Sequence, residues 1–354
     1  MRHTTAVFAV ILAGGSLAAM LPASAQQTPQ TEAPQPPAAQ AEPSTMGTVV
    51  VTGSLPGPGL WRVTRGQHTL YILGTISPLP SGMDWNAAQV ESVLAQAQEV
   101  IAPGRAQNKV GIGAAFKIAS LARSAMKATR IPDRQTLQDL LPAPVFSQWR
   151  ALKAKYLPND TAVERVRPIF ASQELYSSAI SASGMTGSAL VWDRVSALAK
   201  AKGVAITETD VNFPLVIDRD KYKAGIQALS NARADEVSCF TETLDTLESD
   251  LEAMKQTANA WATGDPAVLG APGNVERQPA CKAEYDRLMG FQERPELAAQ
   301  ARAKWLAAAQ SALDRNQVTL AVLPIADLVG ADGQLAQLSA KGYQVSAPDD
   351  ASSD

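Results

Sequence analysis

The sequence predicts an α/β protein with a central mixed sheet, strand-helix-strand units at both ends and a large helical insertion. The first observation is a pair of apolar, β-rich runs followed by a helical pattern over residues 60–101. The second is a strand, helix and strand pattern over residues 318–346. The third is helical periodicity between them, strongest over residues 235–263. Because strand-helix-strand units build one sheet, the helices of about residues 111–315 are expected to be inserted into it.

The amino-acid composition is that of a globular protein. Of the 354 residues, 46% are hydrophobic, which is enough for a sizeable buried core. The 31 basic residues nearly balance the 34 acidic residues. Nucleic acids and anionic membrane surfaces attract proteins with an excess of basic residues. The overall charge therefore argues against both kinds of partner.

Residues 1–25 have the pattern of a secretory signal peptide. A short positive segment precedes an apolar stretch, and Ala23-Ser24-Ala25 forms a cleavage site of small residues. An uncleaved membrane anchor is the alternative, but Gly14-Gly15 interrupts an apolar run that is too short to span a bilayer. No cysteine follows the cleavage site, which disfavours a lipoprotein. We therefore expect a periplasmic or secreted protein whose mature chain begins at Gln26.

The remaining chain divides into three parts. Residues 26–47 are rich in Pro, Ala and Gln and cannot bury enough apolar surface to fold, so a disordered tether is expected. Residues 48–348 are expected to form the folded domain, and residues 349–354 a disordered tail. No segment after the signal peptide has the length of a transmembrane helix.

The first strand-helix-strand unit begins with a hairpin. Leu60–Val63 and Thr69–Leu73 are β-rich runs joined by the turn dipeptide Arg65-Gly66. Asn86 can cap a helix over residues 87–98, and Val100-Ile101 then forms a buried strand.

The central part of the chain is predicted to be mainly helical. Gly203 is expected to cap the last helix of this part, and a short strand over Val204–Ile206 follows it. The expected helices cover residues 112–126, 145–155, 168–180 and 189–202.

Residues 235–263 form the strongest amphipathic pattern, with apolar residues at alternating spacings of three and four. Glu242, Asp245, Glu248 and Glu252 lie off this stripe and are interpreted as a solvated face rather than a metal-binding row. A second long helix over residues 296–313 is expected to pack back on the first.

The two cysteines of the chain are Cys239 and Cys281. In an oxidising compartment an even count suggests one disulfide, which would staple the helical region. The alternative is two buried free thiols.

The C-terminal unit contains a continuous apolar strand over residues 318–323, of the kind that is buried in a parallel sheet. A helix over residues 334–341 and a final strand over residues 343–346 follow.

Two motifs resemble those of the TraB/GumN family. Gly74-Thr75-Ile76-Ser77 resembles the Gly-x-x-His that ends the first core strand of relatives, with Ser77 in place of histidine. Near the C-terminus, Leu328, Gly330 and Gly333 match a second signature, but Pro324 replaces its glycine and Asp327 its histidine. The resemblance covers residues 60–348.

The resemblance implies further site positions, and they are kept unevenly. Relatives place a glutamate where this chain has Ala102-Pro103, and an Arg-Asn pair where it has Ala301-Arg302 or Arg302-Ala303. Glu208 resembles a retained family carboxylate. It can equally be a helix cap or pair with Lys200 or Lys202.

Relatives related to the Tiki proteins are regarded as metal-dependent proteases that hold a divalent ion with two histidines and a glutamate. The mature chain has only His68, so a two-histidine site is excluded. A serine hydrolase is also disfavoured, because Ser77 lacks a Gly-x-Ser-x-Gly elbow and only His68 could serve as its base.

These observations favour a non-catalytic family member whose cleft binds a peptide, protein or ligand. No catalytic residue, metal or other cofactor is expected. A metal-dependent hydrolase that binds a divalent ion through Asp327 and Glu208 is the enzyme alternative, and an envelope structural or interaction protein is the third. The family positions expected to bind are Gly74, Ser77, Glu208, Asp327 and Gly330.

Overall fold

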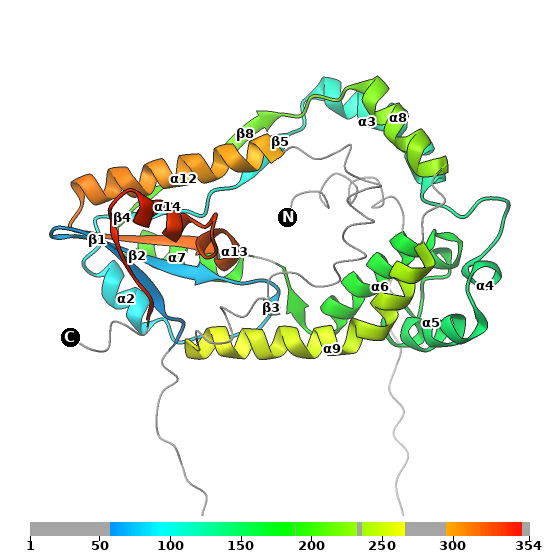
Figure 1. The fold of residues 1–354 in the computed structure, drawn as a ribbon, viewed down its shortest axis with the longest axis horizontal. Coiled ribbons are helices and arrows are strands. Elements are labelled where there is room, and N and C mark those ends of the chain that lie inside the picture. Colours follow the sequence, from blue (N-terminus) through cyan, green and yellow to red (C-terminus); the bar gives the residue numbers. More distant parts are fainter. Residues whose placement is uncertain (1–56, 188, 232–235, 266–294, 349–354) are drawn as a thin grey trace, which may run out of the picture.

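The computed structural model describes residues 57–187, 189–231, 236–265 and 295–348. The predicted signal peptide, tether and tail, together with Cys281, lie outside these ranges. Figure 1 shows three parts: a sheet lobe, a helical lobe, and an arm that runs between them along one edge of the molecule. The long helix α9 (Glu236–Thr263) joins the two lobes along the opposite edge.

The sheet lobe is built on six strands, and the prediction of a central mixed sheet is confirmed. β1 is antiparallel to both of its neighbours, and the other strands run parallel to one another. In spatial order the strands are β10 (Gln344–Ser346), β1 (Leu60–Arg65), β2 (His68–Thr75), β9 (Val318–Pro324), β4 (Glu99–Ile101) and β7 (Ala205–Thr207).

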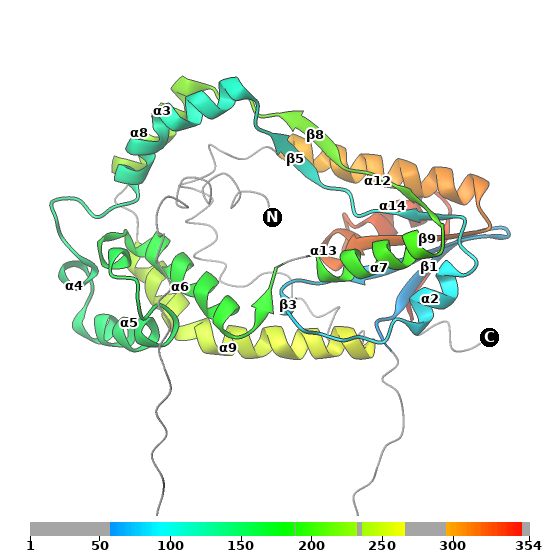
Figure 2. The same cartoon turned by 180° about the vertical axis from the view of Figure 1, so that it is seen from behind.

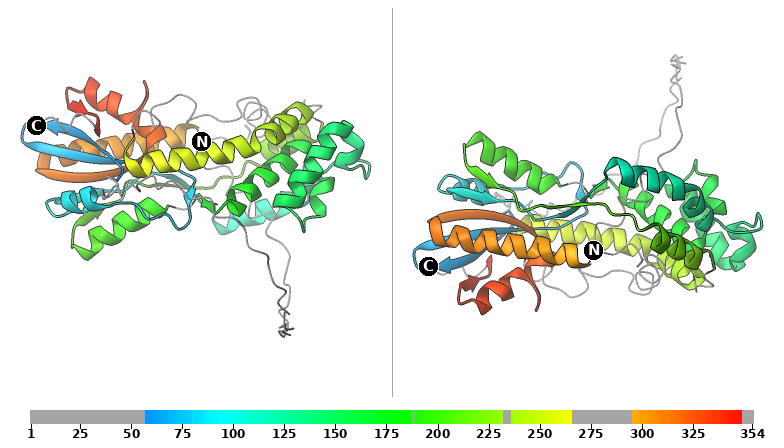
Figure 3. Two further views of the ribbon diagram at one scale, coloured as in Figure 1. Left: turned by 90° about the horizontal axis from the view of Figure 1, so that it is seen from below. Right: turned by 90° about the horizontal axis from the view of Figure 1, so that it is seen from above.

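The sequence explains why the sheet is covered on both faces. In β9, Leu320 and Val322 point into the core beneath α2 (Ala88–Leu94) and α7 (Leu190–Ala201). Ala321 and Leu323 belong to a second core. That second core is covered by α12 (Pro295–Arg315), α13 (Ile325–Leu328) and α14 (Gln334–Ala340). The sheet therefore lies between two helical layers, as Figure 3 shows from two sides, and a continuous apolar strand is the expected sequence for that position.

The structure contradicts one predicted contact, the packing of the second long helix back on the first. The buried residues of α12, including Trp305 and Ala309, belong to the core on one face of the sheet. Those of α9, including Phe240 and Trp261, belong to the core on the other face. Small residues on the buried side of α12 let it lie close to the sheet, so it covers the strands instead of pairing with a helix.

The helical lobe contains most of the inserted helices. It packs on α9, whose stripe of Phe240, Leu244, Leu247 and Leu251 is buried as its periodicity predicted. A two-stranded ribbon of β3 (Leu79–Pro80) and β6 (Met185–Thr186) connects this lobe to the sheet lobe. The helices of the lobe are α4 (Leu137–Leu140), α5 (Ala143–Tyr156), η1 (Ala162–Arg165) and α6 (Pro168–Ala182).

A buried ion pair fixes the start of α9. Arg167, which precedes α6, bonds to Glu236, the first residue of α9, and both side chains are at most 9% exposed. The same guanidinium donates a hydrogen bond of 3.3 Å to the carbonyl of Ala128. Arg167 therefore ties the end of one helix to the beginnings of two others.

The arm was predicted only in part. Its strands β5 (Ala106–Lys109) and β8 (Val211–Pro214) are parallel and lead into α3 (Ile112–Ala128) and α8 (Arg219–Asn231). The two helices lie side by side, as Figures 1 and 2 show from opposite sides. Only α3 was expected from the sequence.

Candidate functional site

The predicted site positions follow the carboxyl ends of parallel strands, which meet at one edge of the sheet. Ser77 follows β2, Asp327 lies in α13 just after β9, and Glu208 follows β7. Ala102-Pro103 follows β4, which lies between β9 and β7. Ligand sites of parallel α/β sheets are commonly found at this edge. We call it the carboxyl edge.

Gly74 is required by packing at the end of β2. A Cβ added there would lie 2.6 Å from Cγ1 of Ile325 and 2.6 Å from Cζ3 of Trp61. The carbonyl of Gly74 accepts a hydrogen bond of 2.7 Å from Nε1 of Trp261 in α9. The residue therefore joins β2, α13 and α9, and its backbone carbonyl already has a protein partner.

Ser77 is half-buried and faces the link between β6 and α7. A Cβ added at Gly187 would be 3.8 Å from the Ser77 hydroxyl oxygen. His68 lies at the opposite end of β2, and the strand of eight residues is about 23 Å long at the usual rise. His68 therefore cannot act as a base for Ser77, which agrees with the argument against a serine hydrolase.

The two carboxylates of the site differ in their surroundings. Asp327 is half-buried in α13, whose neighbouring residues Ile325 and Leu328 are buried, whereas Glu208 is exposed. Neither carboxylate makes an ion pair with any residue that the structure describes. Both are therefore available to a ligand. Gly330, the last predicted position, has φ +97° in the loop between α13 and α14.

The order of the strands separates these carboxylates. β9 and β7 are two strand spacings apart, which is about 10 Å. Between them β4 ends in Ala102-Pro103, which has no side-chain donor atom for a metal. No group of three or more His, Cys, Asp or Glu side chains that could hold a metal occurs in the described ranges.

Two residues that were not predicted from the sequence connect the segment that follows β7 to the segment that follows β4. The buried Thr209 hydroxyl donates a hydrogen bond of 2.8 Å to the Ala102 carbonyl. The Asp210 carboxylate accepts hydrogen bonds from the Arg105 amide, at 3.0 Å, and from the Gln107 side chain. Thr209 and Asp210 are polar residues that come soon after a predicted strand, and this pattern could have indicated the contact.

Glu99 was also missed, and it lies at the other end of β4. Its carboxylate accepts hydrogen bonds from the Thr207 hydroxyl and, at 2.6 Å, from the Asn316 amide. Arg315 lies 3.4 Å from it. A buried carboxylate satisfied in this way holds the strands together and is not available for chemistry.

Aromatic residues support the end of β2 from the α9 side. Trp261 meets Trp85 edge-on with ring centroids 5.5 Å apart. The Arg194 guanidinium lies 4.9 Å from the Trp85 ring centroid and 2.9 Å from the Asp84 carboxylate. These contacts hold α7, α9 and β2 in fixed positions at the carboxyl edge.

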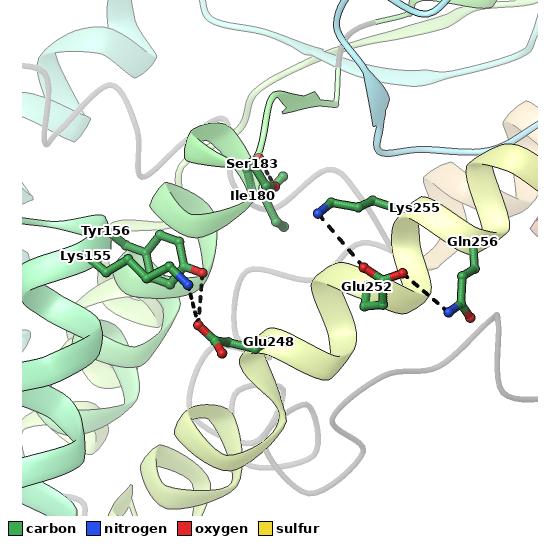
Figure 4. Close-up of polar contacts among 8 residues, drawn as sticks. All are labelled: Lys155, Tyr156, Ile180, Ser183, Glu248, Glu252, Lys255 and Gln256. Carbon is green, nitrogen blue, oxygen red and sulfur yellow. Dashed lines mark hydrogen bonds and ion pairs between the residues drawn. The ribbon is translucent and has the colours of Figure 1, made fainter. Parts of the chain in front are cut away.

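The acidic face of α9 is separate from this edge. Glu248 accepts hydrogen bonds from Lys155, at 2.5 Å, and from the Tyr156 hydroxyl, at 3.4 Å, on the outside of the helical lobe (Figure 4). The bond to Lys155 lowers the pKa of Glu248, and the same bond raises the pKa of Lys155. Asp245, Glu248 and Glu252 are exposed, as the predicted solvated face requires, whereas Glu242 is only partly exposed and one of its carboxylate oxygens is buried.

The fold and the site together define an α/β protein with a mixed six-stranded sheet and a candidate site at its carboxyl edge. The model of the TraB/PrgY/gumN family matches residues 59–347, so this chain belongs to that family. Neither a curated protein nor a solved structure matches the chain. Within the described ranges, no helix is long and apolar enough to cross a membrane.

Proposed function

We propose that this protein is a non-catalytic member of the TraB/PrgY/gumN family that binds a ligand at the carboxyl edge. The observation that supports this most strongly is that the side chains at this edge do not form a complete set of metal ligands. Ser77, Ala102-Pro103 and Asp327 occupy the positions at which the resemblance implies metal ligands, and the middle strand supplies none. A metal that activates water needs several ligands in fixed geometry around it.

The groups at the edge favour a ligand that donates hydrogen bonds or carries positive charge. Asp327 and Glu208 are acceptors without an ion-pair partner among the described residues. The strands that precede them, β9 and β7, lie two strand spacings apart, about 10 Å, so an extended ligand that crosses the edge can reach both segments. Carboxylates bind ammonium and guanidinium groups through charge-assisted hydrogen bonds. A peptide or protein segment with basic side chains meets these requirements.

Export of the protein is a separate part of this proposal, and it would place the carboxyl edge in the periplasm or outside the cell. The signal pattern of residues 1–25 supports export and lies outside the described residues. The cysteine pairing stays a prediction as well: Cys239 is buried in α9, and Cys281 is not described.

The proposal is tested on purified protein by metal content and by peptide binding. After dialysis we expect no stoichiometric metal and no chelator-sensitive cleavage of a peptide library. Peptides with basic side chains should bind, and Asp327→Asn should weaken their binding by about tenfold, as expected for the loss of one charge-assisted bond.

Asp332→Asn is the matched control, because Asp332 is an exposed carboxylate in the next loop. It should leave peptide binding unchanged. About one equivalent of retained metal together with chelator-sensitive hydrolysis would overturn the proposal and support the hydrolase with Asp327 and Glu208 as ligands. Equal peptide binding by the wild type, Asp327→Asn and Asp332→Asn would show that Asp327 is not part of the binding site.

A further inference from the structure

The arm exposes large apolar side chains at the corner where its strands become helices. Val110 and Ile112 are 55% and 80% exposed, and Phe116 is 74% exposed. Val216, which is 66% exposed, lies in the partner segment, because the Leu215 amide bonds to the Lys109 carbonyl at 2.9 Å. We call these four residues the apolar corner. Figures 1 and 2 show this part of the arm at the outer edge of the molecule.

The arm also carries a segregated positive charge. Residues 103–132 contain basic residues but no acidic residue. The nearly balanced charge of the whole chain does not reveal this local excess. On the other side of the arm, Asp218 precedes α8 and accepts hydrogen bonds from the backbone amides of Asp220 and Lys221, so it caps that helix, and Asp220 lies in its first turn. The basic residues of the stretch are Arg105, Lys109, Lys117, Arg123, Lys127 and Arg130.

Some of these basic residues lie on the same outer face of α3 as Ile112 and Phe116 of the apolar corner. Leu121 and Ala125 are buried, and the face that they occupy packs on α8. Ile112, nine residues before Leu121, lies on the opposite side of the helix at 3.6 residues per turn. Phe116, Arg123 and Lys127 follow at helical spacing on that outer side.

Most of these basic groups have no acidic partner among the residues that the structure describes. Neither Arg123 nor Lys127 makes an ion pair with a residue that the structure describes, and the same holds for Lys109. Lys117 is different, since its Nζ donates a hydrogen bond of 3.1 Å to the Ile217 carbonyl. That bond holds the start of α3 against the segment that contains Val216.

We propose that the arm binds the surface of an anionic lipid bilayer. The apolar corner enters the boundary of the acyl chains, while the basic side chains of the outer face contact the anionic headgroups. An amphipathic helix with basic and large apolar side chains binds membranes in this way without crossing them. This inference is independent of the ligand at the carboxyl edge.

The chemistry of the corner distinguishes a bilayer from other anionic partners. Isoleucine, valine and phenylalanine side chains gain little from a phosphate backbone, which is recognised by polar and basic groups. A bilayer offers both an anionic layer and an apolar layer directly beneath it. The combined apolar and basic surface therefore fits a membrane better than a nucleic acid.

The experiment is co-sedimentation of the purified protein with phosphatidylcholine vesicles that contain or lack phosphatidylglycerol. Binding is expected only to the anionic vesicles. It should fall between about 0.1 M and about 1 M salt, where the Debye length shrinks from about 10 Å to about 3 Å. Ile112→Ser with Phe116→Ser, and Arg123→Glu with Lys127→Glu, should each weaken binding by at least about tenfold.

Matched variants test whether the position matters. Lys200→Glu with Lys202→Glu reverses two exposed lysines on the sheet lobe, and Leu140→Ser removes an exposed leucine from the helical lobe. Both should bind vesicles as the wild type does, and so should Asp327→Asn. Circular dichroism checks that each variant is folded, which is expected because Asp327→Asn keeps the size of a half-buried side chain and the other replaced side chains are exposed.

Three results would overturn the inference. The first is a wild-type protein that does not bind anionic vesicles, and the second is equal binding to neutral vesicles. The third is binding that neither double replacement in the arm weakens. Self-association that is lost in Ile112→Ser with Phe116→Ser, without vesicle binding, would identify the apolar corner as a contact between copies of this chain instead.

Discussion

At the scale of single residues, Gly74 determines how closely the first strand approaches its neighbours. A side chain there would overlap Trp61 and Ile325, and the Trp261 indole already holds the carbonyl. We expect Gly74→Ala to lower the free energy of unfolding by about 1–3 kcal/mol, because a stiff ring and a branched side chain must both move. Urea unfolding followed by far-UV circular dichroism measures this change.

Gly82 provides the control for that replacement. Apart from its own chain neighbours, no atom lies within 4 Å of a Cβ built at Gly82, which follows β3. Gly82→Ala should therefore leave the unfolding midpoint nearly unchanged. If Gly74→Ala were equally neutral, the close packing around Gly74 would not contribute to stability, and its place in the family motif would need a functional explanation.

The positions of the candidate site could be predicted from the sequence, but most of their contacts could not. Ser77, Glu208 and Asp327 each follow a recognisable strand, and parallel strands bring such positions to one edge. The bond between Trp261 and Gly74 joins residues far apart in the chain. It depends on where α9 crosses the sheet, and helical periodicity gives no information on that crossing.

At the scale of elements, the Arg167–Glu236 pair connects α6, α9 and the end of α3. Both side chains are nearly buried, so removing one partner leaves an uncompensated charge in the interior. We expect Arg167→Met to lower the free energy of unfolding by about 3–5 kcal/mol. The double replacement with Glu236→Met should recover much of this loss, because no buried charge then remains. A double-mutant cycle by urea unfolding measures both effects.

An exposed ion pair between α5 and α9 gives the comparison. Lys155 and Glu248 are each more than half exposed, so Lys155→Met should change stability little. Equal losses for Arg167→Met and Lys155→Met would show that burial is not the source of the effect. A double replacement no more stable than Arg167→Met would contradict the role of the unpaired carboxylate.

The sequence predicted elements with strong local signals. The expected helix from residue 235 begins at Glu236 in the structure, and Gly66 makes the hairpin turn with φ +60°. The strand expected over Val204–Ile206 lies one residue later, as β7. By contrast, β5, β8 and α8 have weak signals. β5 reads Ala-Gln-Asn-Lys, and β8 pairs with it only because the arm brings the two together.

At the scale of the whole molecule, two kinds of surface lie in different parts of the fold. The carboxyl edge belongs to the sheet lobe, whereas the apolar corner and its basic residues belong to the arm (Figure 1). The nearly balanced overall charge therefore combines an acidic carboxyl edge with a basic arm. A composition averaged over 354 residues cannot reveal such segregation, but counting charges over the length of one predicted helix can.

The two lobes share one hydrophobic core, and this determines how the molecule should unfold. Leu73 and Val322 of the sheet belong to the same cluster of buried residues as Trp149 and Leu175 of the helical lobe. Residues along α9 continue the cluster between them. Because neither lobe can lose α9 without exposing its own core, we expect a single cooperative unfolding transition. Hydrogen exchange at increasing urea should then give the same midpoint for peptides from α6 and from β9.

A replacement in α9 tests this coupling directly. Leu251 is 5% exposed, and Leu251→Ala should lower the free energy of unfolding by about 2–5 kcal/mol through the cavity that it leaves. Both midpoints should shift together, because the shared helix carries the loss to each lobe. Lys255→Ala, at an exposed position one turn later, should shift neither. If only the α6 midpoint shifted, the two lobes would unfold independently. The helical lobe could then unfold while the sheet lobe stayed folded.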